Sequence, residues 1–160
     1  MKEIKIDSHF FVFNDLSELP KEDQLLFSEA KKARNNAYAP YSKFQVGVAL
    51  LLENGQIVLG NNQENAAYPS GMCAERVAIW NASSQYPNNK ILKIFITARS
   101  SKKIVKKPVS PCGACRQTIA EYEVNQNHPI AIYFTGEEGN IIKSNSLLDL
   151  LPLSFDKNLL

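Results

Sequence analysis

Apolar and polar positions recur along the chain with two different periods, and these periods predict where helices and strands lie. Over residues 19–37 the apolar side chains return every three or four positions, which predicts an amphipathic helix. Its apolar stripe consists of Leu26, Ala30, Ala33 and Ala37. Residues 44–61 instead read as two strands joined at Asn54 and Gly55, because this pair supplies the positive φ angles of a tight hairpin turn.

After this hairpin, helical and extended patterns follow one another. The apolar spacing predicts helices over residues 73–85 and 111–123, and strands over residues 91–98 and 129–135. Residues 141–155 read as a short strand followed by a final helix. Because helices and strands alternate, we expect an α/β fold with a mixed central β-sheet and helices on both faces, in three α/β/α layers.

The chain of 160 residues has the usual length of one domain. We expect residues 22–160 to form that domain and residues 1–21 to form an N-terminal extension packed on or beside it. Residues 1–15 read as an extended arm. The C-terminal segment must pack on something, either its own core or another molecule, because of its many leucines: Leu147, Leu148, Leu150, Leu151, Leu153, Leu159 and Leu160.

Composition and charge narrow the classes of function. Hydrophobic residues make up 44% of the chain, enough for an ordinary core, which excludes intrinsic disorder. The formal net charge is only +2, whereas proteins that bind polynucleotides usually carry a denser basic face. No apolar run reaches the roughly 18 residues that cross a bilayer, and the N-terminus lacks a signal cleavage pattern. We therefore expect a cytoplasmic protein with a small-molecule ligand, no membrane contact and no nucleic-acid polymer.

One basic loop could qualify this conclusion. It carries four cations that could attract phosphate but read better as solvated side chains, namely Lys102, Lys103, Lys106 and Lys107.

Three cysteines carry the first candidate chemistry. Cys112 and Cys115 have a spacing found in metal-binding loops, in thioredoxin-like redox pairs and at inert core positions. Cys73 favours a metal, because Cys73 and Cys112 each begin a predicted helix, where backbone N–H groups and the helix dipole stabilise thiolates. Cys112 and Cys115 share a helical face, so three thiolates can bind one zinc ion. The histidines, His9 and His128, lack a ligand-like spacing and read as surface or turn residues.

The chain offers no obvious fourth ligand, and this deficit points to catalysis, because catalytic zinc sites keep one position open for water. Glu75 is the candidate base, although a solvated glutamate in the first helical turn would look the same in sequence. Three thiolates and Zn²⁺ sum to a charge of −1, so a neighbouring cation would help water to lose its proton. Arg76 and Arg116 are the candidates, and either could instead lie in solvent.

These residues resemble the motifs of the small homotetrameric zinc-dependent cytidine deaminases. The resemblance covers about residues 22–155 and extends beyond the cysteine motifs. The matching segments are Cys73-Ala74-Glu75-Arg76, Pro111-Cys112-Gly113-Ala114-Cys115-Arg116-Gln117, Ala37-Tyr38-Ala39-Pro40-Tyr41-Ser42-Lys43-Phe44, Val46-Gly47, Asn62-Gln63-Glu64-Asn65-Ala66, and Leu150-Leu151-Pro152 with Phe155.

The resemblance implies a cytidine deaminase-like fold with one zinc ion per subunit. Cys73, Cys112 and Cys115 would bind the metal, Glu75 would shuttle protons, and Arg76 would balance the charge of the thiolates. The implied reaction is hydrolytic deamination of cytidine, and of 2′-deoxycytidine, to the uridine form with release of ammonia, as in pyrimidine salvage.

The resemblance also implies the substrate contacts. Asn62 and Glu64 would bind the ribose hydroxyls, and Ala74 would line the same pocket. Phe44 would pack on the pyrimidine, although a core aromatic on the first strand would look the same in sequence. Phe155 would complete the pocket of a neighbouring subunit, which makes each active site of the homotetramer depend on assembly.

Four alternatives stay open from the sequence. A blasticidin-S deaminase is similar in its zinc motifs, but Asn62 and Glu64 favour a ribosyl substrate over that antibiotic. A polynucleotide deaminase is disfavoured by the low charge and by Cys73. A zinc-stapled interaction module would need a fourth ligand, and a thioredoxin-like protein would not need Cys73. Gln63 replaces the aliphatic residue usual in the family, which leaves the substrate preference and the subunit contacts open.

Overall fold

A single mixed sheet organises the chain, and the computed structural model describes all of residues 1–160. Its strands run in the order β1-β6-β5-β4-β2-β3, with β4 and β5 parallel and every other pair antiparallel. The strands are β1 (Phe11–Phe13), β2 (Phe44–Leu52), β3 (Ile57–Asn61), β4 (Ile91–Ser100), β5 (Ala131–Thr135) and β6 (Ile141–Ser144). The helices are α1 (Lys21–Asn35), α2 (Ala74–Gln85) and α3 (Gly113–Asn125).

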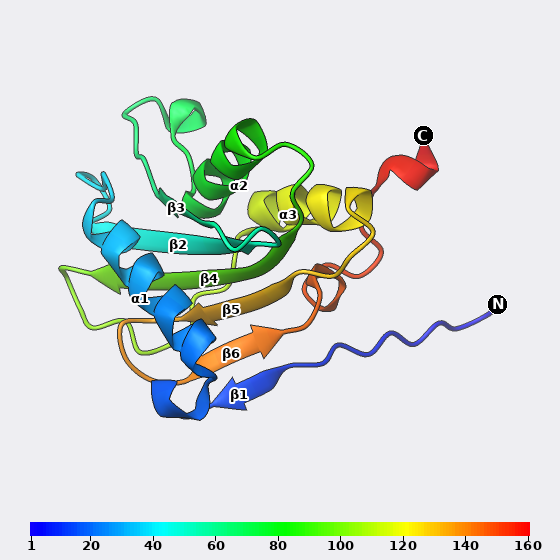
Figure 1. Ribbon diagram of the computed structural model, residues 1–160, viewed down its shortest axis with the longest axis horizontal. Helices are drawn as coiled ribbons and strands as arrows, with labels where there is room; N and C mark the ends of the chain where they lie inside the picture. The colour runs from blue at the N-terminus through cyan, green and yellow to red at the C-terminus, as the bar shows by residue number, and fades with distance from the viewer.

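The helices cover both faces of the sheet, which confirms the three-layer α/β/α architecture expected from the sequence (Figure 1). The alternation of side chains along β2 shows how the layers form, because neighbouring residues of a strand point to opposite faces. Val48 and Leu50 join the core under α2 and α3, whereas Ala49 and Leu51 join the core under α1. The central strands are thus apolar on both faces, as sandwiched strands require.

The hairpin and the three long helices lie where the sequence predicts them, with ends that differ by one or two residues. Gly55 adopts a φ of 81° between β2 and β3, as the turn requires. The prediction of a final helix is wrong, since only short 3-10 turns form at Leu147–Asp149 and Lys157–Leu159. Pro152 lacks the N–H that a helix needs there, and Leu153 adopts a left-handed φ of 59°.

The leucines of the C-terminal segment divide between two environments. Leu147 and Leu150 are buried in the core of their own chain, whereas Leu148, Leu153 and Leu159 are exposed. None of the helices is both long enough and apolar enough to cross a membrane.

The N-terminal extension supplies the outermost strand of the sheet. β1 pairs with β6 through Phe11 opposite Lys143 and Phe13 opposite Ile141. Residues 1–10 continue from β1 away from the body of the molecule (Figure 1). Their one hydrogen bond to the domain runs from the His9 N–H to Asp149 Oδ1, at 3.0 Å.

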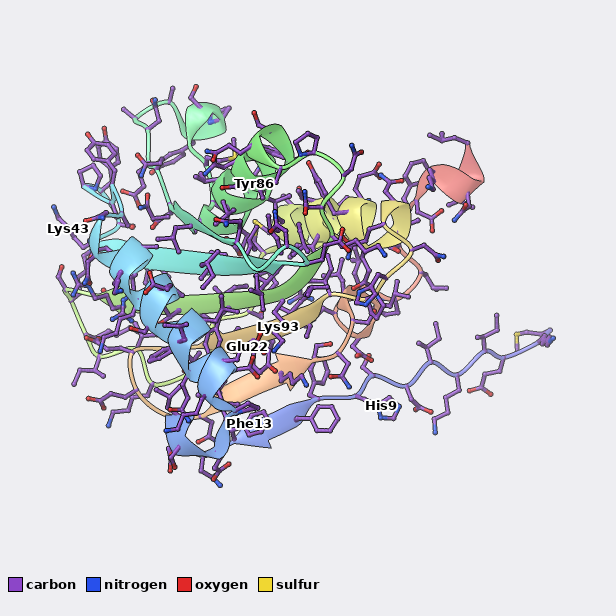
Figure 2. The ribbon with its side chains drawn as sticks, viewed as in Figure 1. His9, Phe13, Glu22, Lys43, Tyr86 and Lys93 are labelled. Atoms are coloured by element: carbon purple, nitrogen blue, oxygen red, sulfur yellow. The ribbon has the colours of Figure 1, made fainter.

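A buried carboxylate fixes α1 on the sheet. Asp23 of α1 is only 2% exposed, and it contacts both Lys93 Nζ and Tyr133 Oη at 2.7 and 2.8 Å. Lys93 also contacts Glu22, which lies beside it at the surface (Figure 2). Burial alone would lower the pKa of Lys93, but its hydrogen bonds to Asp23 and Glu22 raise that pKa, so the amine stays charged. The buried Asp23 carboxylate is therefore satisfied on both oxygens.

Glycine lets α2 approach the sheet closely. A Cβ atom on Gly60 of β3 would lie 2.5 Å from the Ala74 carbonyl oxygen and 2.5 Å from the Ala78 nitrogen. Both of these are backbone atoms of the helix, which cannot move aside by changing a rotamer. The absence of a side chain at Gly60 thus seats the first turn of α2 against β3.

We expect Gly60→Ala to push α2 away from β3 and to lower the free energy of unfolding by about 1–3 kcal/mol. Urea denaturation of the variant would measure this loss as a lower midpoint. Gly113→Ala is the matched control, because an added Cβ there meets no atom within 4 Å. Equal midpoints for the two variants would contradict the packing role of Gly60.

Candidate metal centre

Two helix N-termini meet on one face of the sheet and bring three sulfurs together. Cys73 is the N-cap of α2, Cys112 is the N-cap of α3, and Cys115 lies in the first turn of α3. The three Sγ atoms lie within 4.8 Å of one another, and Cys73 and Cys112 are 3.9 Å apart. Sulfur ligands of a tetrahedral zinc lie about 3.8 Å apart, because each Zn–S bond is about 2.3 Å long. The donor set therefore fits a zinc ion.

The cluster contains no fourth protein ligand. No other His, Cys, Asp or Glu joins the three cysteines. His9 lies on the N-terminal arm, and the ring of His128 contacts the Pro129 carbonyl oxygen at 2.8 Å. Three protein ligands without a fourth is the pattern of a catalytic zinc site rather than a structural one.

As free thiols, Cys73 and Cys115 differ in how readily they lose a proton. Hydrogen bonds from Cys115 and from Arg76 lower the pKa of Cys73 to about 5, even though burial opposes this. The hydrogen bond to Cys73 and burial raise the pKa of Cys115. Of these two sulfurs, Cys73, which faces the arginine, thus forms a thiolate more readily than Cys115.

Arg76 is the cation of the cluster. Its Nη2 donates to Cys73 Sγ at 3.7 Å, and its guanidinium lies 5.8 Å from the centre of the Trp80 ring. The hydrogen bond to Cys73 raises the pKa of Arg76, which therefore stays charged. This contact would let Arg76 withdraw negative charge from the sulfurs, a role that stays a prediction.

Arg116, the second candidate cation, has a different function. Its Nε and Nη1 donate to the carbonyl oxygens of Pro111 and Leu150 at 2.9 and 2.8 Å, and its Nη2 donates to Ser110 Oγ at 3.2 Å. Arg116 thus ties the loop in front of Cys112 to the C-terminal segment, and it makes no hydrogen bond to the sulfurs.

Glu75 is a buried acid in the first turn of α2. It is only 5% exposed, so it is not the solvated helix-start glutamate that the sequence also allowed. Burial raises the pKa of Glu75 to about 7, and the negative charge of Cys73 adds to this effect. Ala74 beside it is fully buried. A carboxyl with this pKa can both accept and donate a proton near neutral pH.

The predicted ribose residues lie next to the start of β2. Asn62 is held by two hydrogen bonds, from the Val46 N–H to its Oδ1 at 2.8 Å and from its Nδ2 to the Phe44 carbonyl oxygen at 3.0 Å. Glu64 accepts from the Tyr41 N–H at 2.9 Å. Both side chains are half-buried and fixed in orientation.

Ser42 is a site residue for which the sequence pattern assigns no role. Its hydroxyl and its N–H both donate to the Glu64 carboxylate. Desolvation opposes these bonds, but the bonds from Ser42 and Tyr41 together hold the pKa of Glu64 below its usual range. The signal was present in the sequence, since Ser42 lies within a segment that matches the family, but its partner becomes visible only in three dimensions.

Gln63, the departure from the family pattern, does not disturb this arrangement. Its backbone N–H and carbonyl exchange hydrogen bonds with Met72 at 2.9 and 2.8 Å, while its exposed side chain donates to Asn61 Oδ1. The substitution therefore changes the outer side of this loop.

Phe44 and Phe155 lie in different surroundings. Phe44 begins β2 and lines a cavity of about 470 Å³ with Lys103 to Ser110, the segment that leads into the Cys112 motif. The Phe155 carbonyl oxygen accepts from Gln117 of α3 at 2.8 Å, and the Phe155 side chain is largely exposed. Within a single chain, Phe155 is thus anchored by its backbone while its ring is available to another surface.

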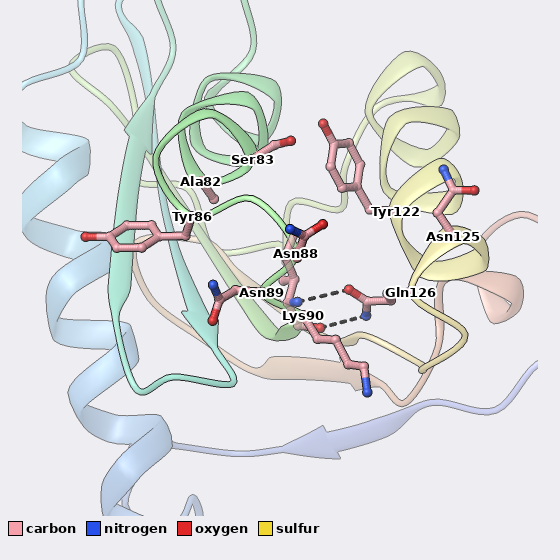
Figure 3. Close-up of a pocket in the computed structure, with 10 residues that line it drawn as sticks. Ala82, Ser83, Tyr86, Asn88, Asn89, Lys90, Tyr122, Asn125 and Gln126 are labelled. Atoms are coloured by element: carbon pink, nitrogen blue, oxygen red, sulfur yellow. Dashed lines mark hydrogen bonds between the residues drawn. The ribbon is translucent and has the colours of Figure 1, made fainter.

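A separate cavity of about 350 Å³ lies between the C-terminal ends of α2 and α3 (Figure 3). Its lining includes Tyr86, Tyr122 and Gln126, and it contains none of the sequence-predicted site residues. Gln126 is occupied there by hydrogen bonds to the Ile91 backbone at 2.9 Å.

Comparisons with known proteins agree with this geometry. Residues 20–128 match the family model described as the cytidine and deoxycytidylate deaminase zinc-binding region. Cytidine deaminase from Halalkalibacterium halodurans is 47% identical over 132 residues, which cover 82% of this chain and 92% of that protein. Cytidine deaminase from Sporosarcina psychrophila is 44% identical over 133 residues, covering 82% of this chain and 90% of the relative.

The fold agrees as well. A crystal structure of cytidine deaminase from Burkholderia pseudomallei superposes with a TM-score of 0.72 at 34% identity, covering 86% of this chain and all of that one. The chain therefore belongs to the cytidine and deoxycytidylate deaminase family of zinc-binding proteins.

Proposed function

We propose that this protein is a zinc-dependent cytidine deaminase, which hydrolyses cytidine and 2′-deoxycytidine to the uridine form and ammonia in pyrimidine salvage. The observation that carries the proposal is the three-sulfur cluster at two helix N-termini, with the buried acid Glu75 beside it. Cys73, Cys112 and Cys115 would hold the zinc ion. The cytoplasmic location expected from the sequence stays a prediction.

The residues of the chain divide the chemistry among them. When bound, zinc would supply Lewis acidity, which lowers the pKa of water to about 7. Glu75 accepts a proton from the attacking water and passes it to N3 of the pyrimidine, which makes C4 more electrophilic. Glu75 then takes the remaining proton from the hydroxyl group on C4 and gives it to the departing amino group, so that water and cytidine give uridine and ammonia. Arg76 offsets the net negative charge that three thiolates leave beside Cys73.

The alternatives fit this arrangement less well. An interaction module stapled by zinc would need a fourth ligand and would not need an acid buried to 5% exposure. A redox pair formed by Cys112 and Cys115 would leave the proximity of Cys73 unexplained. The fixed pair Asn62 and Glu64 favours a ribosyl substrate over blasticidin S.

Replacement of the acid tests the mechanism. We expect Glu75→Gln to keep one zinc per chain but to lower kcat about 10²- to 10⁴-fold, because it cannot carry a proton. Ultraviolet absorbance with cytidine and metal analysis measure the two effects. Glu121→Gln, at an exposed carboxylate on α3, is the control and should keep the normal rate. A near-normal rate in Glu75→Gln would refute the assigned role.

Selectivity for the sugar provides a second test. We expect Glu64→Gln to lower kcat/KM for cytidine about 10- to 100-fold, because an ionic hydrogen bond to a hydroxyl is lost. The change for 2′,3′-dideoxycytidine, which lacks both hydroxyls, should stay under about threefold. Ser42→Ala is the control, since it removes the support of Glu64 but not the carboxylate itself. Equal losses on both nucleosides would contradict a sugar contact.

The assembly is the remaining part of the proposal. The protein forms a homotetramer in which Phe155 of one chain completes the substrate pocket of a neighbour. The exposed ring and the anchored backbone of Phe155 support this arrangement.

Mixing two impaired chains tests the shared site. We expect Phe155→Ala and Glu75→Gln each to have low activity alone. Coexpressed at equal amounts, they should regain activity in about a quarter of the sites, where an intact Glu75 meets a neighbour's intact Phe155. The rates of separately purified variants, added together without subunit exchange, give the baseline. Activity that stays at this baseline would exclude a contribution of Phe155 to a neighbouring site.

A further inference from the structure

The N-terminal arm has an apolar face that the domain does not cover. Along residues 1–12, apolar side chains occupy the even positions Ile4, Ile6, Phe10 and Val12, whereas most odd positions are charged or polar. This period of two is the pattern of a strand with one buried face. The side chains of Ile4 and Ile6 are nevertheless 76% and 47% exposed, and those of Phe10 and Val12 are 43% and 56% exposed.

The arm also has an unpaired backbone edge. β1 is the last strand of the sheet, so its side opposite β6 carries no ladder of hydrogen bonds. The His9 N–H points to Asp149 on the β6 side. Because peptide groups alternate along an extended chain, the N–H and C=O groups of the even residues point to the open side.

The charges of the arm are complementary to those of a second copy in one antiparallel register. When Ile6 faces Ile6 across a two-fold axis, residues 1–11 pair, Lys5 faces Asp7, and Glu3 faces His9. These are non-hydrogen-bonded positions, where opposite side chains come closest. In a single chain Lys5 and Asp7 are exposed and only contact each other, at 3.5 Å.

The neighbouring registers are poorer. Centring the pair on Lys5 places Lys5 against Lys5 and Glu3 against Asp7, so like charges face each other. Centring it on Ile4 opposes only one pair of unlike charges, Glu3 and Lys5. Centring it on Ser8 opposes only Asp7 and His9. The register centred on Ile6 therefore opposes the most unlike charges without a repulsive contact.

We infer that the arms of two copies of this chain pair as antiparallel strands centred on Ile6, along the open edge that β1 begins. The interface is isologous, since each arm presents the same residues to the other. The apolar residues of both arms then form one continuous face on the two-stranded ribbon. This contact lies outside the family-matched residues 20–128 and is independent of the deaminase activity.

Cross-linking at the two-fold axis tests the pairing. Ile6→Cys places two cysteines about 5.5 Å apart between Cα atoms, within disulfide range. We expect oxidised glutathione to convert zinc-loaded Ile6→Cys largely to a covalent dimer on a non-reducing gel, with the unsubstituted chain as background. Ile4→Cys is the matched control, because its two cysteines would lie about 14 Å apart and the variant should stay monomeric on the gel.

Charge reversal in the Ile6→Cys background checks that the cross-link reports paired arms. Adding Lys5→Asp should slow dimer formation about tenfold, since Asp would face Asp7 twice. Adding Lys5→Asp together with Asp7→Lys should restore the rate, because the charges are exchanged but remain opposite. Absence of an Ile6→Cys dimer, equal or faster cross-linking by Ile4→Cys, or no rescue by the charge exchange would each overturn the inference.

Discussion

The structure depends on one constraint, which is that two helices must begin at the same point above one sheet. The N-caps of α2 and α3 are both cysteines, and the positive ends of both helix dipoles point at their sulfurs. This geometry helps to stabilise a thiolate at Cys73 and places Cys115 on the same side. The close approach of α2 at Gly60 and the apolar faces of the central strands serve to hold these two helix ends in register.

The sequence predicts the parts of this arrangement that depend on local patterns. The helix starts at Cys73 and Cys112, the turn at Gly55 and the apolar strands all follow from spacing along the chain. The prediction for the C-terminal segment failed, because its leucine spacing is helical while Pro152 and the left-handed Leu153 prevent a helix. The spacing of apolar residues does not reveal how a segment that cannot form a helix packs on the core.

Contacts between residues far apart in the chain could not be predicted from the sequence. The sequence does not distinguish Arg76 from Arg116 as candidate cations, since Arg76 directly follows the candidate base and Arg116 directly follows a candidate ligand. Three dimensions separate them, because Arg76 reaches the Cys73 sulfur while Arg116 reaches backbone carbonyls on two segments. In the same way, the burial of Glu75 distinguishes a candidate base from a solvated glutamate at a helix start. The alternation of apolar and polar residues in the N-terminal arm, in contrast, is visible in the sequence. Only the structure shows that the arm continues from a strand with an open edge, β1.

The position of Arg116 couples the order of the C-terminal segment to the order of the loop in front of Cys112. Its guanidinium fastens Pro111, just before a metal-site cysteine, to Leu150, just before the segment that carries Phe155. Whatever orders that segment therefore stabilises the loop that presents Cys112, and whatever orders the loop stabilises the segment. Thermodynamic linkage makes this relation reciprocal. If docking of the C-terminal segment raises the affinity of the cysteines for a metal ion, the metal ion favours docking of that segment by the same factor.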